Sequence, residues 1–76
     1  MKQYIVFGGY SYYASGGWFD FIEDFDSAEE AVEFAEKILN TSIKRPMDEN
    51  QVDIDFSHVV DTAEKTVIRE FGYNYA

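Results

Sequence analysis

One amphipathic helix, predicted to start after Ser27, divides the chain into two halves that each contain two strand-like segments. Ser27 and Glu30 fit a capping box, in which the serine hydroxyl accepts from the Glu30 amide and the Glu30 carboxylate returns to the Ser27 amide. The residues that follow repeat at helical spacing and form one apolar stripe: Ala28, Ala31, Val32, Ala35, Ile38 and Leu39. This stripe predicts a helix that packs one face against a sheet.

The strand-like segments are residues 2–7, 18–23, 51–60 and 66–71, each rich in β-branched or aromatic side chains. In the second segment, alternation places Phe19 and Phe21 on one face and Asp20 on the other. In the third, His58 shares a face with Phe56 and Val60. Residues 43–50 are polar, contain Pro46 and are expected to form a loop. The order ββαββ predicts a single α+β domain over residues 1–76, with one amphipathic helix packed on one face of an antiparallel sheet.

Stability must come from apolar packing, because the chain has no cysteine and one histidine among 76 residues. A disulfide and a structural zinc site are therefore both excluded. Seven Phe, six Tyr and one Trp supply large apolar areas per residue. A homodimer would be a second source of stability.

Acidity is the strongest compositional signal, since 15 Asp and Glu stand against six Lys and Arg for a net charge of −9. This charge disfavours direct nucleic-acid binding, which depends on cations that neutralise phosphates. It favours a partner protein with a basic surface. The candidate contact carboxylates lie on the predicted helix and the third strand: Glu29, Glu33, Glu36, Asp53 and Asp55. The alternative is that the acidity only keeps a small aromatic-rich domain soluble.

A second candidate binding region runs from Gly8 to Trp18, where two glycine pairs bracket Tyr10, Tyr12, Tyr13 and Trp18. Glycines allow a ligand to approach the backbone closely, and Tyr and Trp dominate recognition surfaces. The same tyrosines could instead close the edge of the core. No lysine follows the glycines as a phosphate-binding loop requires.

Catalysis has little support in the sequence, so we expect no enzymatic activity, no catalytic residue and no cofactor. His58 is expected to be packed, and its neighbour Ser57 points to the opposite face. Asp20, Asp53 and Asp55 could approach a hard cation, but the spacing of a calcium-binding loop is missing and we expect no metal. Lys44 and Arg45 form a basic pair that could contact an anionic ligand.

The first residues lack the basic and apolar regions of a signal peptide, and no apolar run is long enough to cross a membrane. We therefore expect a cytoplasmic protein with no membrane partner.

Four runs carry a resemblance to a class of small, uncharacterised, acidic proteins encoded by bacteriophages. They are residues 4–9 (YIVFGG), 16–21 (GGWFDF), 25–31 (FDSAEEA) and 58–62 (HVVDT). The resemblance transfers no site residue. It implies a phage protein in the host cytosol that acts on host machinery, including defence systems.

Three functional interpretations follow. The first is a non-enzymatic inhibitor that occupies a basic, nucleic-acid-binding surface of a host protein. The second is a sponge that sequesters a small nucleotide-like ligand through the Tyr/Trp/Gly loop. The third is an accessory or assembly module.

Overall fold

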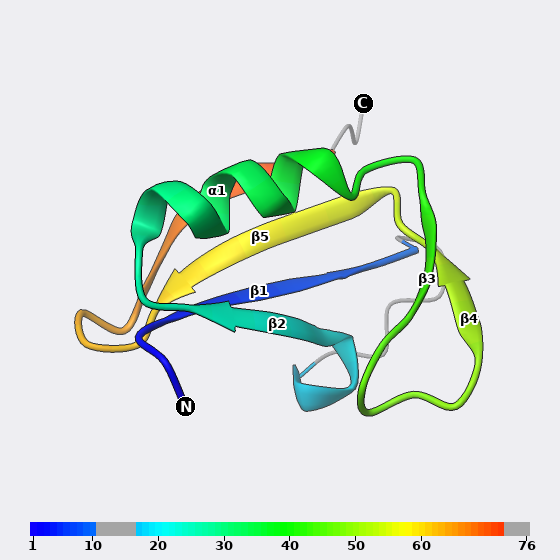
Figure 1. The fold of residues 1–76 in the computed structure, drawn as a ribbon, viewed down its shortest axis with the longest axis horizontal. Coiled ribbons are helices and arrows are strands. Elements are labelled where there is room, and N and C mark those ends of the chain that lie inside the picture. The colour runs from blue at the N-terminus through cyan, green and yellow to red at the C-terminus, as the bar shows by residue number, and fades with distance from the viewer. Residues whose placement is uncertain (11–16, 73–76) are drawn as a thin grey trace.

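The structure, a computed structural model, describes residues 1–10 and 17–72. It confirms the α+β class: one helix packs on an antiparallel sheet, and a small second sheet lies beside the first (Figure 1). The elements are β1 (Tyr4–Gly9), a 3₁₀ helix (Gly17–Asp20), β2 (Phe21–Phe25), α1 (Ala28–Lys37), β3 (Ser42–Lys44), β4 (Gln51–Asp53), β5 (Phe56–Asp61) and β6 (Thr66–Phe71).

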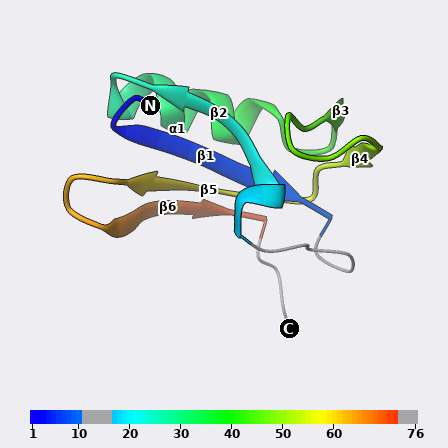
Figure 2. The ribbon, with the colours of Figure 1, turned by 90° about the horizontal axis from the view of Figure 1, so that it is seen from below.

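The main sheet has the strand order β2-β1-β5-β6, and every neighbouring pair is antiparallel. Figure 2 shows the four strands in this order, with β2 and β6 at the two edges. In the centre, Val6 lies opposite Val59 and Phe7 lies opposite His58. Adjacent side chains on a strand point to opposite faces, so these two pairs mark the two faces of the sheet.

The helix begins where the capping pattern predicts. Ser27 has extended backbone angles, and its hydroxyl accepts a hydrogen bond from the Glu30 N–H at 3.4 Å. Among the described residues, no reciprocal bond joins the Glu30 carboxylate to the Ser27 amide, so the capping box is half formed. At the other end, Asn40 has a positive φ of 64° and its N–H donates to the Ile54 carbonyl at 2.7 Å.

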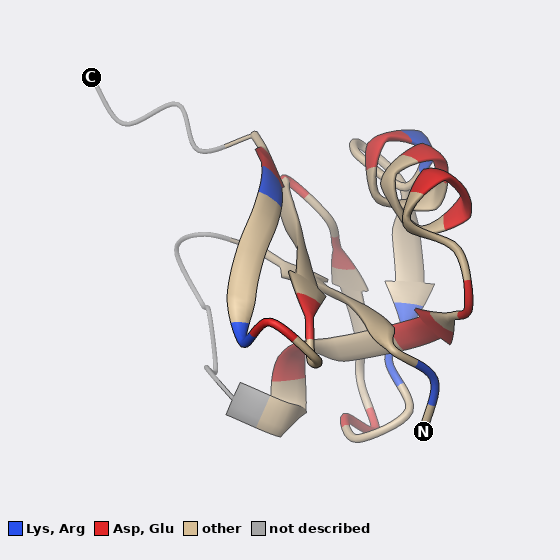
Figure 3. Cartoon of the chain, turned by 90° about the vertical axis from the view of Figure 1, so that its left-hand side faces the viewer, with Lys and Arg blue, Asp and Glu red and all other residues tan. Residues whose placement is uncertain are grey.

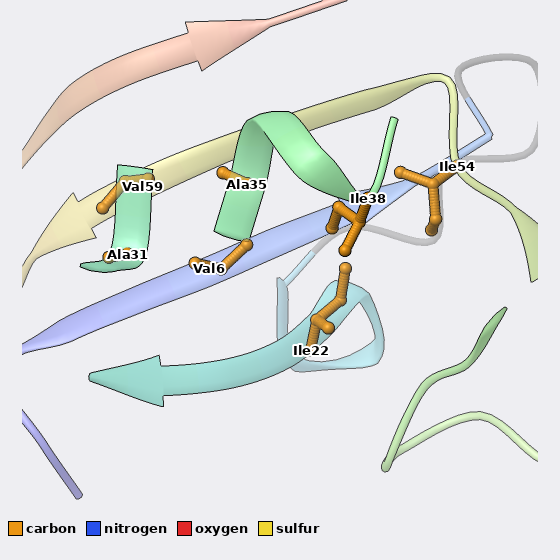
Figure 4. Close-up of a cluster of buried hydrophobic side chains, with 7 residues drawn as sticks. All are labelled: Val6, Ile22, Ala31, Ala35, Ile38, Ile54 and Val59. Atoms are coloured by element: carbon orange, nitrogen blue, oxygen red, sulfur yellow. The ribbon is translucent and has the colours of Figure 1, made fainter. Parts of the chain in front are cut away.

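The core lies between α1 and one face of the main sheet (Figure 4). Ala31, Ala35 and Ile38 of the helix pack over Val6 and Val59 of the two central strands. The two alanines are small, which lets the helix approach the sheet closely. Ile22 and Ile54 close the core at its margin.

The predicted strand over residues 51–60 is interrupted, which corrects the sequence interpretation. β4 ends at Asp53 and pairs with β3, whereas β5 starts at Phe56 and pairs with β1. The Ile54 N–H donates to the Thr41 carbonyl at 2.8 Å, and the Asp55 N–H donates to the Gly9 carbonyl at 2.9 Å. These bonds turn the chain from one sheet to the other. The expected loop over residues 43–50 accordingly contains most of β3, which is only three residues long.

The segment over residues 18–23, predicted as one strand, also differs from that prediction. It starts as a 3₁₀ helix, and β2 begins only at Phe21. Phe19 is 60% exposed and Asp20 is buried, so the expected alternation of an apolar inner face and a polar outer face is wrong here. The reason is a tertiary ion pair that draws Asp20 inward.

Candidate functional site

The solvent face of α1 carries the carboxylates that the sequence singles out. Glu29, Glu33 and Glu36 are all exposed. With the rise of an α-helix, they follow one another at about 6 Å and about 4.5 Å along the axis. We call them, together with the exposed Glu23, Asp26 and Glu30, the acidic surface. Figure 3 shows acidic residues concentrated along the helix and at the end of β2.

Negative charge predominates on the acidic surface, since residues 20–36 contain no Lys or Arg and Lys37, at the end of α1, is the one cation of the helix. The two ion pairs among the described residues both belong to Arg45, which binds Asp20 and Asp48. The carboxylates of the acidic surface are in neither pair. They therefore present net negative charge to solvent or to a partner.

The opposite face of the main sheet carries an aromatic cluster of Phe7, Trp18, Phe21 and His58. The Trp18 ring lies 6.0 Å from that of Phe7 and 5.7 Å from that of Phe21, between ring centroids. The His58 ring stacks on Phe7 at 5.2 Å with 24° between the planes. Trp18 nevertheless remains 51% exposed. A half-exposed tryptophan held by other rings is a typical anchor for a binding partner.

Beside Trp18 lies a shallow pocket of about 380 Å³, within the size range of small-molecule sites. Its walls are mostly apolar, and its one charged lining side chain is that of Lys2. The lining residues are Met1, Lys2, Ile5, Phe7, Trp18, Val60 and Thr62.

The acidic surface and the aromatic cluster lie on opposite faces of the sheet. Val6 and Val59 point toward α1, so Phe7 and His58, which follow or precede them, point away from it. A single flat partner surface therefore cannot contact both.

The other candidate binding residues do not lie together at one site. Tyr12 and Tyr13 lie outside the described residues. Tyr10 follows β1, is partly exposed and lines a pocket of about 260 Å³ with Gln51, Val52 and Asp53. Asp53 is exposed on β4, whereas Asp55 is half-buried at the turn between the two sheets. They do not share one strand face, and residues 1–10 and 17–72 contain no group of three or more side chains placed to hold a metal.

Comparison with known protein families gives a match. The family of bacteriophage T4 protein Y07C matches the chain over residues 4–70, which is most of its length. The chain belongs to this family. The match confirms the resemblance to small phage-encoded proteins that the four sequence runs carry. No curated protein and no solved structure matches the chain.

Sequence reasoning missed the internal role of one buried side chain of this member of the Y07C family, Arg45. It is 1% exposed, and its Nη1 donates to the Gly8 carbonyl at 3.0 Å and to Asp20 Oδ1 at 2.5 Å. Its Nη2 donates to Asp48 Oδ2 at 2.6 Å. Arg45 is thus used inside the fold and is not available to an anionic ligand, whereas Lys44 is exposed.

The first glycine pair serves this internal contact. A Cβ on Gly9 would lie 2.6 Å from Arg45 Nη1, and one on Gly8 would lie 2.8 Å from the Phe56 carbonyl oxygen. The two glycines end β1 and are buried. The close approach to the backbone that these glycines allow is therefore made by other parts of the same chain, the Arg45 side chain and the Phe56 carbonyl. A glycine pair at the end of a strand, with an arginine in the polar segment 43–50, is the signal that could have suggested it.

His58 is packed, as the sequence indicates. Burial lowers the pKa of its imidazole, and the carboxylates of Glu70 and Asp20 oppose that shift. Its neighbour Ser57 points into the core on the other face and donates to the Ala35 carbonyl at 2.7 Å. The two side chains cannot act together as a nucleophile and base.

Within residues 1–10 and 17–72, no helix has the length and apolar character needed to cross a bilayer.

Proposed function

We propose that this phage protein is a non-enzymatic inhibitor of a host protein, of the defence class, and that it occupies a basic, nucleic-acid-binding surface of that protein. The acidic surface is the contact region. In the host cytosol, its carboxylates take the place of the phosphates that the basic surface normally binds.

The observation that carries the proposal is the row of Glu29, Glu33 and Glu36 on a capped helix. All three are exposed, and none is in the ion pairs of the described residues. Because α1 packs its opposite side on the sheet through Ala31, Ala35 and Ile38, the row is held on a rigid element. Charges fixed on a rigid element bind at a lower entropic cost than charges on a flexible segment.

The chemistry also predicts how binding responds to salt. Contacts between carboxylates and Lys or Arg weaken as ions screen them, with a Debye length of about 8 Å at physiological ionic strength. Affinity that depends on the acidic surface should therefore fall steeply as NaCl is raised.

The test is capture from a nuclease-treated host lysate on immobilised protein, with the bound proteins identified by mass spectrometry. Three forms are compared: the natural sequence, the variant Glu29→Gln/Glu33→Gln/Glu36→Gln, and the control Glu49→Gln/Glu64→Gln/Glu70→Gln. Both variants lose three negative charges at exposed positions, but only the first loses them from the helix. Their circular dichroism spectra should be native.

We expect a nucleic-acid-binding protein to be retained by the natural and control proteins, released by added DNA, and lost by about tenfold or more with the helix variant. Equal capture by all three forms would exclude the acidic surface as the contact region. Equal loss in the two variants would mean that total charge, and not its position, controls binding.

The pocket beside Trp18 favours a second candidate function, sequestration of a small ligand with a flat ring. Trp18 is the one tryptophan of the chain, so its fluorescence reports on this site alone. Titration with nucleotides should quench and saturate that fluorescence if a base stacks on the ring. An unchanged spectrum at millimolar nucleotide would remove this candidate.

A further inference from the structure

The structure points to a second surface, the outer edge of β6. We propose that two copies of this chain pair there, antiparallel, and join their sheets into one of eight strands. In the described part of the chain, β6 has a hydrogen-bonded neighbour on one side only (Figure 2). It is six residues long and contains no proline. Such an edge offers backbone N–H and C=O groups to another strand.

The side chains along this edge leave room for a neighbour. Val67 is 46% exposed, although it is apolar, and Thr66, Arg69 and Glu70 are exposed as well. A shallow groove of about 400 Å³ is lined by four consecutive residues of the strand, Val67, Ile68, Arg69 and Glu70. A second strand laid along β6 would fill this groove and cover Val67.

The two edge strands of the main sheet, β2 and β6, differ in net charge. β2 carries Glu23 and Asp24 and belongs to the stretch without Lys or Arg. β6 and the turn before it carry Glu64, Lys65, Arg69 and Glu70, which sum to zero. For a chain of net charge −9, a second copy meets less repulsion at this neutral edge than at the β2 edge.

Antiparallel pairing of two identical strands also makes the edge complementary to itself. The pairing of β6 with β5 shifts register between Val67 and Arg69, so Val67 and Glu70 share one face, and Lys65, two residues before Val67, lies on it too. Pairing in which Val67 lies opposite its own copy therefore brings Lys65 of one strand toward Glu70 of the other, and does so twice by symmetry. This complementarity favours a second copy over an unrelated strand.

The geometry keeps the acidic regions of the two copies apart. The joined order β2-β1-β5-β6-β6-β5-β1-β2 has seven strand spacings, so the two β2 edges lie about 34 Å from each other. The helices, each centred over β1 and β5, lie about 19 Å apart on the same face. That distance exceeds a helix diameter of about 12 Å and is roughly two Debye lengths. The helices therefore neither clash nor repel strongly.

The experiment is light scattering coupled to size exclusion, from about 10 µM to about 1 mM protein. Val67→Lys places two ammonium groups at the shared edge, and Met47→Lys is the matched control at another exposed apolar residue, 55% exposed and outside β6. We expect the natural protein and the Met47→Lys variant to reach twice the monomer mass of 8.8 kDa. The Val67→Lys variant should stay at 8.8 kDa, and Glu29→Gln/Glu33→Gln/Glu36→Gln should pair as the natural protein does.

A natural protein that remains at 8.8 kDa up to about 1 mM would overturn the proposal, as would unchanged pairing in Val67→Lys. Amide hydrogen exchange of the natural protein supplies an independent measurement that needs no folded variant. Amides of β6 should gain protection as concentration rises. Concentration-dependent protection confined to other strands, or to the region of Trp18, would assign the contact elsewhere and contradict pairing through β6.

Discussion

At the scale of single residues, Arg45 connects the segment after β3 to the end of β1 and to Asp20 before β2. The side chain follows β3, enters the protein beside Gly9 and binds Asp20 and the Gly8 carbonyl. The carboxylate of Asp20 is itself buried, so the guanidinium is what compensates its charge. Breaking a buried ion pair by removing one partner is far more costly than replacing both.

We expect Arg45→Met to lower the free energy of unfolding by about 3 kcal/mol, because Asp20 is left buried without its cation. Urea unfolding followed by circular dichroism measures the change. The double variant Arg45→Met/Asp20→Asn, which removes both charges, should recover part of the loss. A double variant no more stable than the single one would contradict the view that loss of the Arg45 charge beside Asp20 causes the damage.

His58 gives the protein a pH dependence of its own. Burial depresses the folded-state pKa of the imidazole below its ordinary value of 6.5. As the pH falls, the imidazole is therefore protonated in the unfolded chain before it is protonated in the folded protein. The stability that the neutral, buried imidazole contributes is fully present above pH 6.5 and is lost as the pH falls through the folded-state pKa. The urea midpoint should thus respond less to acidification from about pH 7.5 to about pH 5.5 in His58→Phe than in the natural protein.

The phenylalanine in this variant keeps a ring beside Phe7, so packing is disturbed little. The charge repulsion that acidification relieves is common to both proteins, and the difference between them isolates His58. Glu70→Gln provides a second measurement, because the Glu70 carboxylate favours the protonated imidazole and its removal should deepen the loss. Identical pH profiles for the natural protein and His58→Phe would show that the imidazole does not contribute.

At the scale of the elements, α1 is the part whose start depends most on a local contact. The Ser27 hydroxyl caps it through the Glu30 amide, and the reciprocal bond is missing among the described residues. Ser27→Ala should therefore cost about 1 kcal/mol, the usual value for a serine cap. Ser42→Ala on the exposed strand β3 is the control and should be nearly neutral. A Ser27→Ala variant as stable as the control would mean that Asp26 caps the helix.

At the scale of the whole molecule, the net charge of −9 should make stability depend on ionic strength. Like charges repel more in the compact state than in the unfolded chain, and salt screens that repulsion. The thermal midpoint should therefore rise as NaCl increases from about 10 mM to about 300 mM. The rise should be smaller in Glu33→Gln/Glu36→Gln, which carries two fewer charges on α1. A midpoint that ignores NaCl in both proteins would show that the acidity has little effect on folding.

The sequence alone was sufficient for the features that depend on local interactions or on composition. The helix could be located from Ser27, Glu30 and the apolar stripe, because capping and helical periodicity act within a few residues. The antiparallel α+β class followed from the order of strand-like segments, and the four sequence runs indicated a small phage-encoded protein. The exposure of Glu29, Glu33 and Glu36 followed from their place opposite that stripe.

Tertiary contacts decided the rest. Asp20 was expected outside and is inside, because Arg45, 25 residues away in the chain, compensates its charge. The break between β4 and β5 depends on backbone bonds from Ile54 and Asp55 to partners distant in sequence, which alternation cannot indicate. Alternation also fails to tell which face of β5 meets the helix, since Val59 is buried on one face and Phe56 on the other. The acidic surface and the aromatic cluster are separated because α1 packs on the face of β5 that carries Val59. Alternation along a strand defines two faces but does not indicate which of them the helix covers.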